Sequence, residues 1–416
     1  MVGFIVLIWM ATIFNSQEYA DFGMIYAMQT GVIIFSTAGI IQIMVSIMKE
    51  RQSRENGGAN NFFALFKWST LFSVMAIFIF GMIGQAEKNN LANFLPLIMS
   101  VISGAVLSYS LVASSYHRIE GRHLEAVAWT FFPNFGYFLF GGIGFAFEQT
   151  VNGFFCGGLI GCIMPIIILA QRSERAISLF CGNRVSRSHV LDMSPYWLAS
   201  IVLWLSGYGG IWLISLTSNE NEIAEFIFVM NVTSVLQIVA TSLHQVWSSK
   251  FYQLYNVLNT GELEKKNDKF YLVQGIAIGV FGLLGMLLIK YASGIFLEIR
   301  AINFDSLLPY YLMFLSVAIS VPWCHAQDYF YVNGEGGKFM KAILVSGIIG
   351  IPLWLMTILL IGEAGIYFGY CLFVLSRVIA AQITASKIWH INLMWKGPVA
   401  GGVLLSLGYI YFEFRT

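Results

Sequence analysis

Long apolar runs recur along the 416-residue chain and are separated by short polar segments. A helix of about 20 such residues crosses the ~30 Å hydrocarbon core of a bilayer. The runs are continuous, whereas strands of a membrane β-barrel would show ~10 residues of alternating polarity. The pattern therefore predicts an all-α polytopic membrane protein. It places spans at approximately residues 1–14, 22–47, 62–84, 94–116, 124–148, 151–171, 193–216, 223–244, 269–290, 307–331, 338–361, 363–387 and 397–412.

A short motif occurs twice at nearly half the chain length. Residues 18–22 (EYADF) return as residues 222–226 (EIAEF), an offset of 204. A second pair, 116–121 (YHRIEG) and 331–336 (YVNGEG), follows equivalent predicted spans at an offset of 215. An even number of spans separates the copies, so they share one orientation. The repeat predicts two parallel lobes of six helices and one extra helix, with a substrate site between the lobes. The motif copies themselves are interpreted as helix-start turns, not as ligands.

The repeat also sets the expected domain boundaries. We expect an N-terminal lobe at 1–171, a cytoplasmic linker at 172–192, a C-terminal lobe at 193–387 and the additional helix at 388–416. Residues 245–268 fit either an interfacial amphipathic helix or a continuation of the eighth span.

The first apolar run stops at Asn15 and is shorter than the ~20 residues that a span needs. Under the 204-residue offset, its counterpart at 193–216 would begin about ten residues before Met1. We therefore expect either about ten preceding residues or a half-length helix. The run lacks a basic leader, so no cleavable signal peptide is expected.

Composition and charge support the membrane assignment and add an orientation. Hydrophobic residues make up 57% of the chain and charged residues 11%, whereas a soluble domain carries about 25% charged residues. If the amino terminus is cytoplasmic, 17 of the 23 Lys and Arg residues fall in inner loops and 4 on the outer side. By the positive-inside rule, this bias predicts a cytoplasmic amino terminus.

No pattern for catalysis or cofactor binding is found. The chain has no Walker loop, zinc-ligand spacing or nucleophile elbow. The five cysteines lack metal spacing, and we interpret them as small apolar residues. We therefore expect a non-enzyme without cofactor, metal or nucleic-acid partner, driven by an ion gradient or by downstream use of its substrate.

The first copy of the repeated motif carries a family resemblance. Residues 15–22 (NSQEYADF) resemble the Gly-Pro-x-Glu-Tyr-Gly-x-Phe junction of polysaccharide flippases, and Glu18, Tyr19 and Phe22 occupy matching positions. Asn15, Ser16 and Ala20 differ, so the turn depends less on glycine here. In addition, the loops 333–338 (NGEGGK) and 362–365 (GEAG) resemble the family's short turns before the eleventh and twelfth helices.

The resemblance implies a function. That family belongs to a superfamily that also contains multidrug exporters and the lipid II flippase. The resemblance implies a V-shaped protein that flips an undecaprenyl-diphosphate-linked O-antigen or capsule repeat unit across the bacterial inner membrane by alternating access. The implied partners are this lipid-linked oligosaccharide, membrane lipids, a coupling Na⁺ or H⁺, and polysaccharide polymerase and chain-length proteins.

Two other functions are alternatives to a flippase. One is a Na⁺- or H⁺-coupled small-molecule or multidrug exporter on the same fold. The other, a membrane glycosyltransferase or polymerase, is disfavoured because such enzymes generally need a large outer loop with clustered acidic groups.

Cations within the spans are the candidates for binding an anionic substrate. Charges are costly in lipid and usually face an interior cavity. We assign Arg377 and Lys67 to the diphosphate, since Arg offers bidentate phosphate contacts. Alternatively, Lys67 reaches the inner interface with its long side chain, and Arg377 pairs with Asp328.

A second candidate site lies in the tenth span. His325 and Asp328 are three residues apart and share a helix face. Such a pair could carry a coupling proton or bind Na⁺. The alternatives are a buried hydrogen-bonded pair near the inner end of the span, or interfacial polar residues.

Glycines are expected to interrupt the seventh span. Gly207, Gly209 and Gly210 lie within it, and Trp204 and Tyr208 beside them could stack on sugar rings. The alternative is ordinary packing, for glycines and aromatic rings alike. Pro133 is expected to interrupt the fifth span in the same way.

Overall fold

The computed structural model describes residues 2–38, 40, 58–87, 94–119, 122–172, 187–255, 257–292, 306–333, 335–391 and 395–414. Helices make up nearly all of these residues, and no strand occurs among them. The chain divides into two compact units. The first contains Met1–Ile13 and Gln17–Trp212, and the second contains Phe14–Ser16 and Leu213–Thr416.

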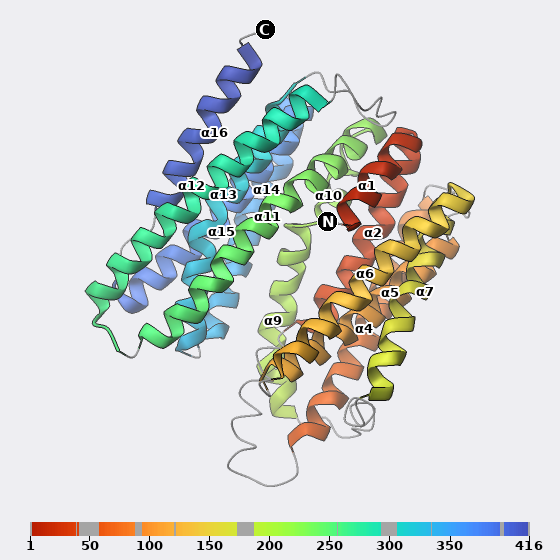
Figure 1. The fold of residues 1–416 in the computed structure, drawn as a ribbon, viewed down its shortest axis with the longest axis horizontal. Coiled ribbons are helices and arrows are strands. Elements are labelled where there is room, and N and C mark those ends of the chain that lie inside the picture. The colour runs from red at the N-terminus through yellow and green to blue at the C-terminus, as the bar shows by residue number, and fades with distance from the viewer. Residues whose placement is uncertain are drawn as a thin grey trace. The chain divides into compact units, whose positions relative to one another are not determined.

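The first unit is a bundle of helices coloured red to yellow-green in Figure 1. Its helices are α1 (Val2–Ile13), α2 (Ser16–Thr37), α4 (Gly58–Glu87), α5 (Phe94–Ile119), α6 (His123–Glu148), α7 (Val151–Arg172), α9 (Arg187–Leu205) and the first half of α10 (Gly210–Ile214).

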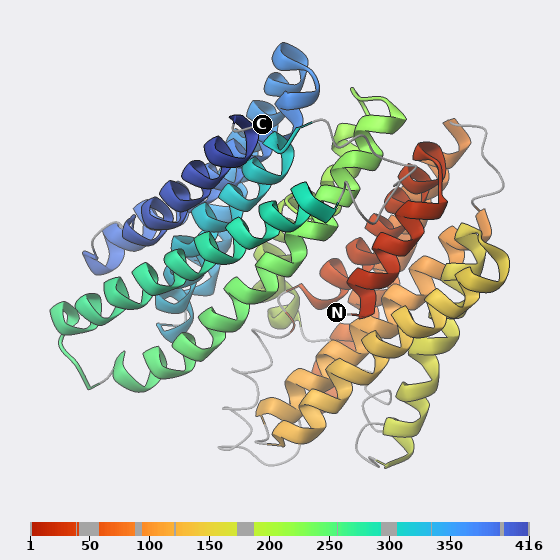
Figure 2. The same cartoon turned by 45° about the horizontal axis from the view of Figure 1, so that its top comes forward.

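The second unit is a bundle of long helices coloured green to blue in Figures 1 and 2. It consists of α11 (Glu220–Tyr255), α12 (Thr260–Ala292), α13 (Leu308–Val332), α14 (Gly336–Ile361), α15 (Glu363–Trp389) and α16 (Lys396–Phe414).

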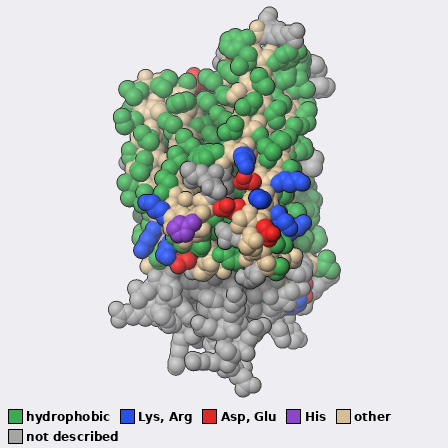
Figure 3. Space-filling view, turned by 90° about the vertical axis from the view of Figure 1, so that its left-hand side faces the viewer, with side chains coloured by type: hydrophobic (Ala, Val, Ile, Leu, Met, Phe, Trp, Pro, Cys, Tyr) green, Lys and Arg blue, Asp and Glu red, His purple; other side chains and the backbone are tan. Residues whose placement is uncertain are grey.

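The helices agree with the predicted spans, and the all-α membrane fold is confirmed. Among the described residues, eight helices are long and apolar enough to cross a membrane, and three shorter helices are also apolar. Most of the described face in Figure 3 is hydrophobic, with Lys, Arg, Asp and Glu gathered towards one end. Exposed large hydrophobic residues line α12, namely Leu272, Val273, Ile276, Val280, Phe281, Leu284 and Leu288. This surface suits lipid, because water would be a poor solvent for so large an apolar face.

Each copy of the repeated motif opens a helix and anchors it to an equivalent neighbour. The helices α2 and α11 begin at Ser16 and Glu220, which are 204 residues apart. Phe22 is buried and packs against Phe154 and Phe155 of α7. Phe226 is buried in the corresponding place, against rings of α14 and α15. The motif copies therefore serve packing at helix starts, as the sequence predicted.

Glycines bring the paired helices together. The most extensive packing in the first unit joins α6 to α7, and in the second unit it joins α14 to α15. A Cβ on Gly161 of α7 would collide with the carbonyl of Gly136 on α6. One on Gly365 of α15 would collide with the carbonyl of Thr357 on α14. Such small-residue contacts are a main source of helix association in lipid, where no hydrophobic force favours it.

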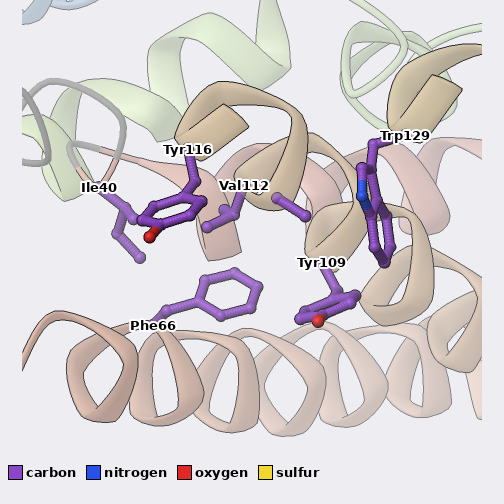
Figure 4. Close-up of a cluster of buried hydrophobic side chains, with 7 residues drawn as sticks. Ile40, Phe66, Tyr109, Val112, Tyr116 and Trp129 are labelled. Carbon is purple, nitrogen blue, oxygen red and sulfur yellow. The ribbon is translucent and has the colours of Figure 1, made fainter. Parts of the chain in front are cut away.

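Aromatic side chains fill the space between α4, α5 and α6. Tyr109 and Tyr116 of α5 and Trp129 of α6 form a buried cluster with Phe66 and Ile40, shown in Figure 4. The rings of Tyr109 and Trp129 meet edge to face with centroids 5.6 Å apart, a favoured aromatic geometry.

The helix boundaries test three details predicted from the sequence. The helix α11 continues to Tyr255, so the eighth span extends into residues 245–268, and a separate interfacial helix there is wrong. The glycine interruption is confirmed, because α9 ends at Leu205 and α10 begins at Gly210. The interruption at Pro133 is wrong, because α6 runs through it. A membrane helix tolerates proline where neighbouring groups compensate.

The compact units and the predicted lobes divide the chain by different criteria. The predicted lobes follow the repeat and begin the second half at residue 193, whereas the compact units follow contacts and keep α9 with the first unit. The region 173–186, which covers most of the predicted linker, lies outside the described residues.

We predict that Gly161→Ala destabilises the protein by about 1–3 kcal/mol, because the added methyl overpacks the α6–α7 contact. The thermal unfolding temperature of the purified protein in detergent should fall accordingly. The matched control is Gly337→Ala, since a Cβ at Gly337 meets nothing within 4 Å. Equal unfolding temperatures for the two variants would contradict the glycine contact.

Candidate functional site

A buried polar cluster joins α11 and α13 in the second unit. His244 of α11 and His325 and Asp328 of α13 each offer one ligand atom, and these atoms lie within 4.8 Å of one another. His325 and Asp328 are 1% and 2% exposed. The predicted pair therefore does share a buried helix face, and the structure adds a second histidine to it.

The Asp328 carboxylate is held by side chains of α11. Ser248 donates a hydrogen bond to Asp328 Oδ1 at 2.5 Å, and Tyr252 donates to the same oxygen at 3.1 Å. His244 Nε2 lies 3.6 Å from this oxygen. Residues 244, 248 and 252 are four apart, so they occupy one face of the helix. These two donors fix the position of the Asp328 carboxyl group.

A glutamine of α12 sets the proton position on His325. The Gln274 amide nitrogen donates to the Ala240 carbonyl at 2.9 Å, which directs its oxygen towards His325. His325 Nε2 lies 2.8 Å from that oxygen. An amide oxygen only accepts, so Nε2 carries the proton and the lone pair of the neutral ring is on Nδ1.

Sequence reasoning missed His244, Ser248, Tyr252 and Gln274. His244 could have been found, because it lies at the end of the predicted eighth span and an ionisable residue in a span is itself a signal. The other three depend on α11 continuing to Tyr255 and on the packing of α12, which the sequence left open.

Arg377 lies on α15, within a membrane-spanning helix. Its guanidinium carbon is 4.9 Å from the centroid of the Trp323 ring on α13, a cation–π arrangement. Trp323 is 7% exposed and also packs on Phe339. Asp328 is the alternative partner of Arg377 that was predicted from the sequence. Asp328 accepts hydrogen bonds from Ser248 and Tyr252 of α11.

Lys67 is an exposed residue of α4 in the first unit. Its neighbour Trp68 is 59% exposed. Lys67 and Arg377 thus belong to different units. The exposed position of Lys67 is compatible both with contact to a ligand and with the long side chain reaching an interface.

Trp204 holds the interrupted seventh helix against α2. Its indole nitrogen donates to the Ala27 carbonyl at 2.9 Å, and its ring contacts Phe35 and Phe80. A Cβ on Gly209 would collide with this ring, so the backbone of the break lies directly against it. In this arrangement the Trp204 ring is 6% exposed and serves packing.

Tyr208 lies in the break itself and is half-buried. Its ring meets that of Tyr26 edge to face at 4.9 Å. The indole nitrogen of Trp212 donates to the Met24 carbonyl at 3.1 Å, one turn before the Trp204 bond. Two tryptophans therefore attach both sides of the break to α2.

The fold is that of known membrane transporters. No family model matches the chain, and no curated protein matches it. An inward-facing MATE family multidrug transporter of the MOP superfamily superposes with a TM-score of 0.69 at 15% identity, covering 98% of this chain and 94% of that one. The lipid II flippase MurJ gives 0.65 at 12% identity, covering 99% and 96%. A MOP superfamily transporter from Pyrococcus furiosus gives 0.61 at 15% identity, covering 98% and 94%.

These likenesses extend over nearly the whole chain and establish its fold class. The chain is an all-helical, multi-pass membrane protein with the fold of MOP superfamily transporters. The similar structures are described as transporters and a flippase, not as enzymes.

We predict that Trp204→Ala destabilises the protein by about 3–5 kcal/mol, the usual cost of removing a buried tryptophan. Trp68→Ala removes the same residue type from an exposed position and should leave the unfolding temperature nearly unchanged. The measurement is thermal unfolding of both purified variants. Trp204→Ala behaving like Trp68→Ala would exclude the packing role.

Proposed function

We propose that this protein is a flippase that moves an undecaprenyl-diphosphate-linked oligosaccharide, an O-antigen or capsule repeat unit, from the cytoplasmic to the periplasmic leaflet of the bacterial inner membrane. The observation that carries the proposal is Arg377, a guanidinium within the apolar helix α15. A cation at such a position is costly and is expected to serve an anionic ligand. The fold shared with a lipid II flippase and the junction at residues 15–22 support the lipid-linked class.

Arg377 and Lys67 are the proposed partners of the diphosphate. A guanidinium offers parallel N–H donors that match two phosphate oxygens, and such charge-assisted bonds strengthen away from water. Trp323 beneath the guanidinium would limit the freedom of movement of the Arg377 side chain. Lys67, an exposed cation of the first unit, is proposed as the second partner of the diphosphate.

The two aromatic residues at the helix break differ in how readily they could contact a sugar. Tyr208 is half-buried, so it keeps the proposed stacking role. Trp204 has its N–H and ring engaged by α2, Phe35 and Phe80, so stacking on a sugar requires the break to rearrange. The break supplies a place for such a rearrangement, because Ser206–Gly209 separate α9 from α10.

The proposal also covers the transport cycle, the coupling ion and the partner proteins. Two lobes would form a V-shaped cavity and open alternately to each side, with the amino terminus cytoplasmic. Asp328 and His325 are the proposed site for a coupling cation, Na⁺ or H⁺. Polysaccharide polymerase and chain-length proteins would receive the product.

A coupled small-molecule exporter is the second candidate function. The fold shared with a multidrug MATE transporter and the buried His–Asp cluster favour it. In an exporter of cationic compounds, the carboxylate of Asp328 would contribute to binding, and Arg377 would be a structural cation.

We predict that a strain lacking this protein regains surface polysaccharide with the wild-type gene but not with Arg377→Ala. The loss of one charge-assisted contact, about 1.5–3 kcal/mol, corresponds to at least about a tenfold slower transport. Arg377→Lys should recover only part of the activity, because Lys cannot make the bidentate contact. Surface polysaccharide and the amount of protein in the membrane would both be measured.

Lys387→Ala is the matched control, since it removes an exposed cation from the same helix α15. It should restore polysaccharide like the wild type. Unchanged polysaccharide in the deletion strain, together with increased drug sensitivity, would reject the flippase in favour of the exporter.

A further inference from the structure

We propose that His244, His325 and Asp328 form a binding site for a divalent transition-metal ion, with Zn²⁺ the best match. Their ligand atoms lie within 4.8 Å of one another, on two helices that pack directly together. Two imidazoles and one carboxylate are a common protein donor set for such ions. This inference does not rest on the proposed transport function, and it assigns a divalent ion to residues that the coupling proposal assigns to Na⁺ or H⁺.

The spacing of the donors suits a tetrahedral ion after a small closure. Zinc takes nitrogen and oxygen ligands at 2.0–2.2 Å, so its ligand atoms lie roughly 3.3 Å apart. The observed upper separation of 4.8 Å therefore requires movements of about 1.5 Å, within the reach of side-chain rotation. His325 and Asp328 are on consecutive turns of α13, and His244 approaches from α11.

Unsatisfied buried atoms point to a ligand. His325 Nδ1, His244 Nδ1 and Asp328 Oδ2 are buried and have no hydrogen-bond partner among the described residues, and the other nitrogen of His244, Nε2, lies 3.6 Å from Asp328 Oδ1. Buried polar atoms nearly always have a partner, and each exception calls for an explanation. The unpartnered nitrogen of His325 is the one that Gln274 leaves unprotonated, so it offers a lone pair to a metal.

The surrounding bonds resemble the outer shell of a metal site. A metal-bound histidine usually donates its other N–H to a carbonyl or carboxylate, which fixes the ring. Gln274 accepts that bond from His325 and is itself fixed by the Ala240 carbonyl. The Asp328 carboxylate is likewise held by Ser248 and Tyr252. These bonds orient the donors before any ion binds, which reduces the entropic cost of binding.

Charge and donor type select the class of ion. In its ionised form, the Asp328 carboxylate beside two neutral imidazoles would leave one uncompensated negative charge among apolar helices, which is costly. A divalent cation would compensate it. Imidazole nitrogen favours zinc and its transition-metal neighbours, whereas Mg²⁺ and Ca²⁺ prefer sites built from oxygen. A bound ion would link α11 to α13 within the second unit.

The test is metal binding by the purified full-length protein in detergent, with ZnCl₂ as the only added ligand. Titration calorimetry should show one Zn²⁺ per chain, and Zn²⁺ should bind at least tenfold more tightly than Mg²⁺ or Ca²⁺. His325→Gln and Asp328→Asn should each weaken binding at least tenfold. His390→Gln, which removes an exposed histidine of the same unit, should bind like the wild type.

Two further measurements keep the test valid if those variants fold poorly. Gln274→Leu leaves all three donors in place and should weaken Zn²⁺ binding about 10–100-fold through loss of the outer-shell bond. The X-ray absorption spectrum of the Zn²⁺-loaded wild type should show two imidazole ligands. The absence of Zn²⁺ binding by the wild type, a spectrum without imidazole ligands, or loss of binding only in His390→Gln would overturn the proposal. Each result is independent of whether the protein transports an oligosaccharide.

Discussion

The absence of water in the hydrocarbon core is the constraint on which this structure depends. Every backbone N–H and C=O must be paired within the protein, and helices achieve this locally. The same rule applies to side chains, which bind backbone groups of neighbouring helices. Trp204 donates to the Ala27 carbonyl, Gln274 to the Ala240 carbonyl and Gln382 to the Pro322 carbonyl. Such bonds, together with glycine contacts, replace the hydrophobic force that assembles soluble bundles.

The same constraint identifies the sites that need a function. Apolar helices gain nothing from carrying a charge, so Arg377 and the cluster around Asp328 are exceptions that call for a role. Arg377 lies against Trp323, and the Asp328 cluster retains buried atoms without partners among the described residues. One exception suits an anionic ligand and the other suits a cation. Both lie in the second unit.

Hydropathy and glycine positions predicted most of the fold, because both act locally. The length of an apolar run determines where a helix can cross the membrane. Gly207, Gly209 and Gly210 interrupt their helix whichever neighbours it packs against. Trp204 was harder to interpret, because its partner Ala27 is 177 residues away in sequence. His244 was overlooked because its role depends on α11 meeting α13. The grouping of α9 with the first unit also depends on long-range contacts, whereas the repeat assigns this helix to the second half.

The repeat has a physical meaning beyond duplication of sequence. In each unit a buried Phe near the start of one helix, Phe22 of α2 or Phe226 of α11, packs on the helix pair that glycines bring together, α6–α7 or α14–α15.

The most direct test of the proposed function is translocation by the purified protein in lipid vesicles. An undecaprenyl-diphosphate-linked oligosaccharide placed in one leaflet would be followed by its accessibility to a glycosidase in the other. We expect oligosaccharide to appear in the second leaflet faster in vesicles with the protein than in protein-free vesicles. No acceleration, combined with ion-driven movement of a cationic dye by the same vesicles, would contradict it.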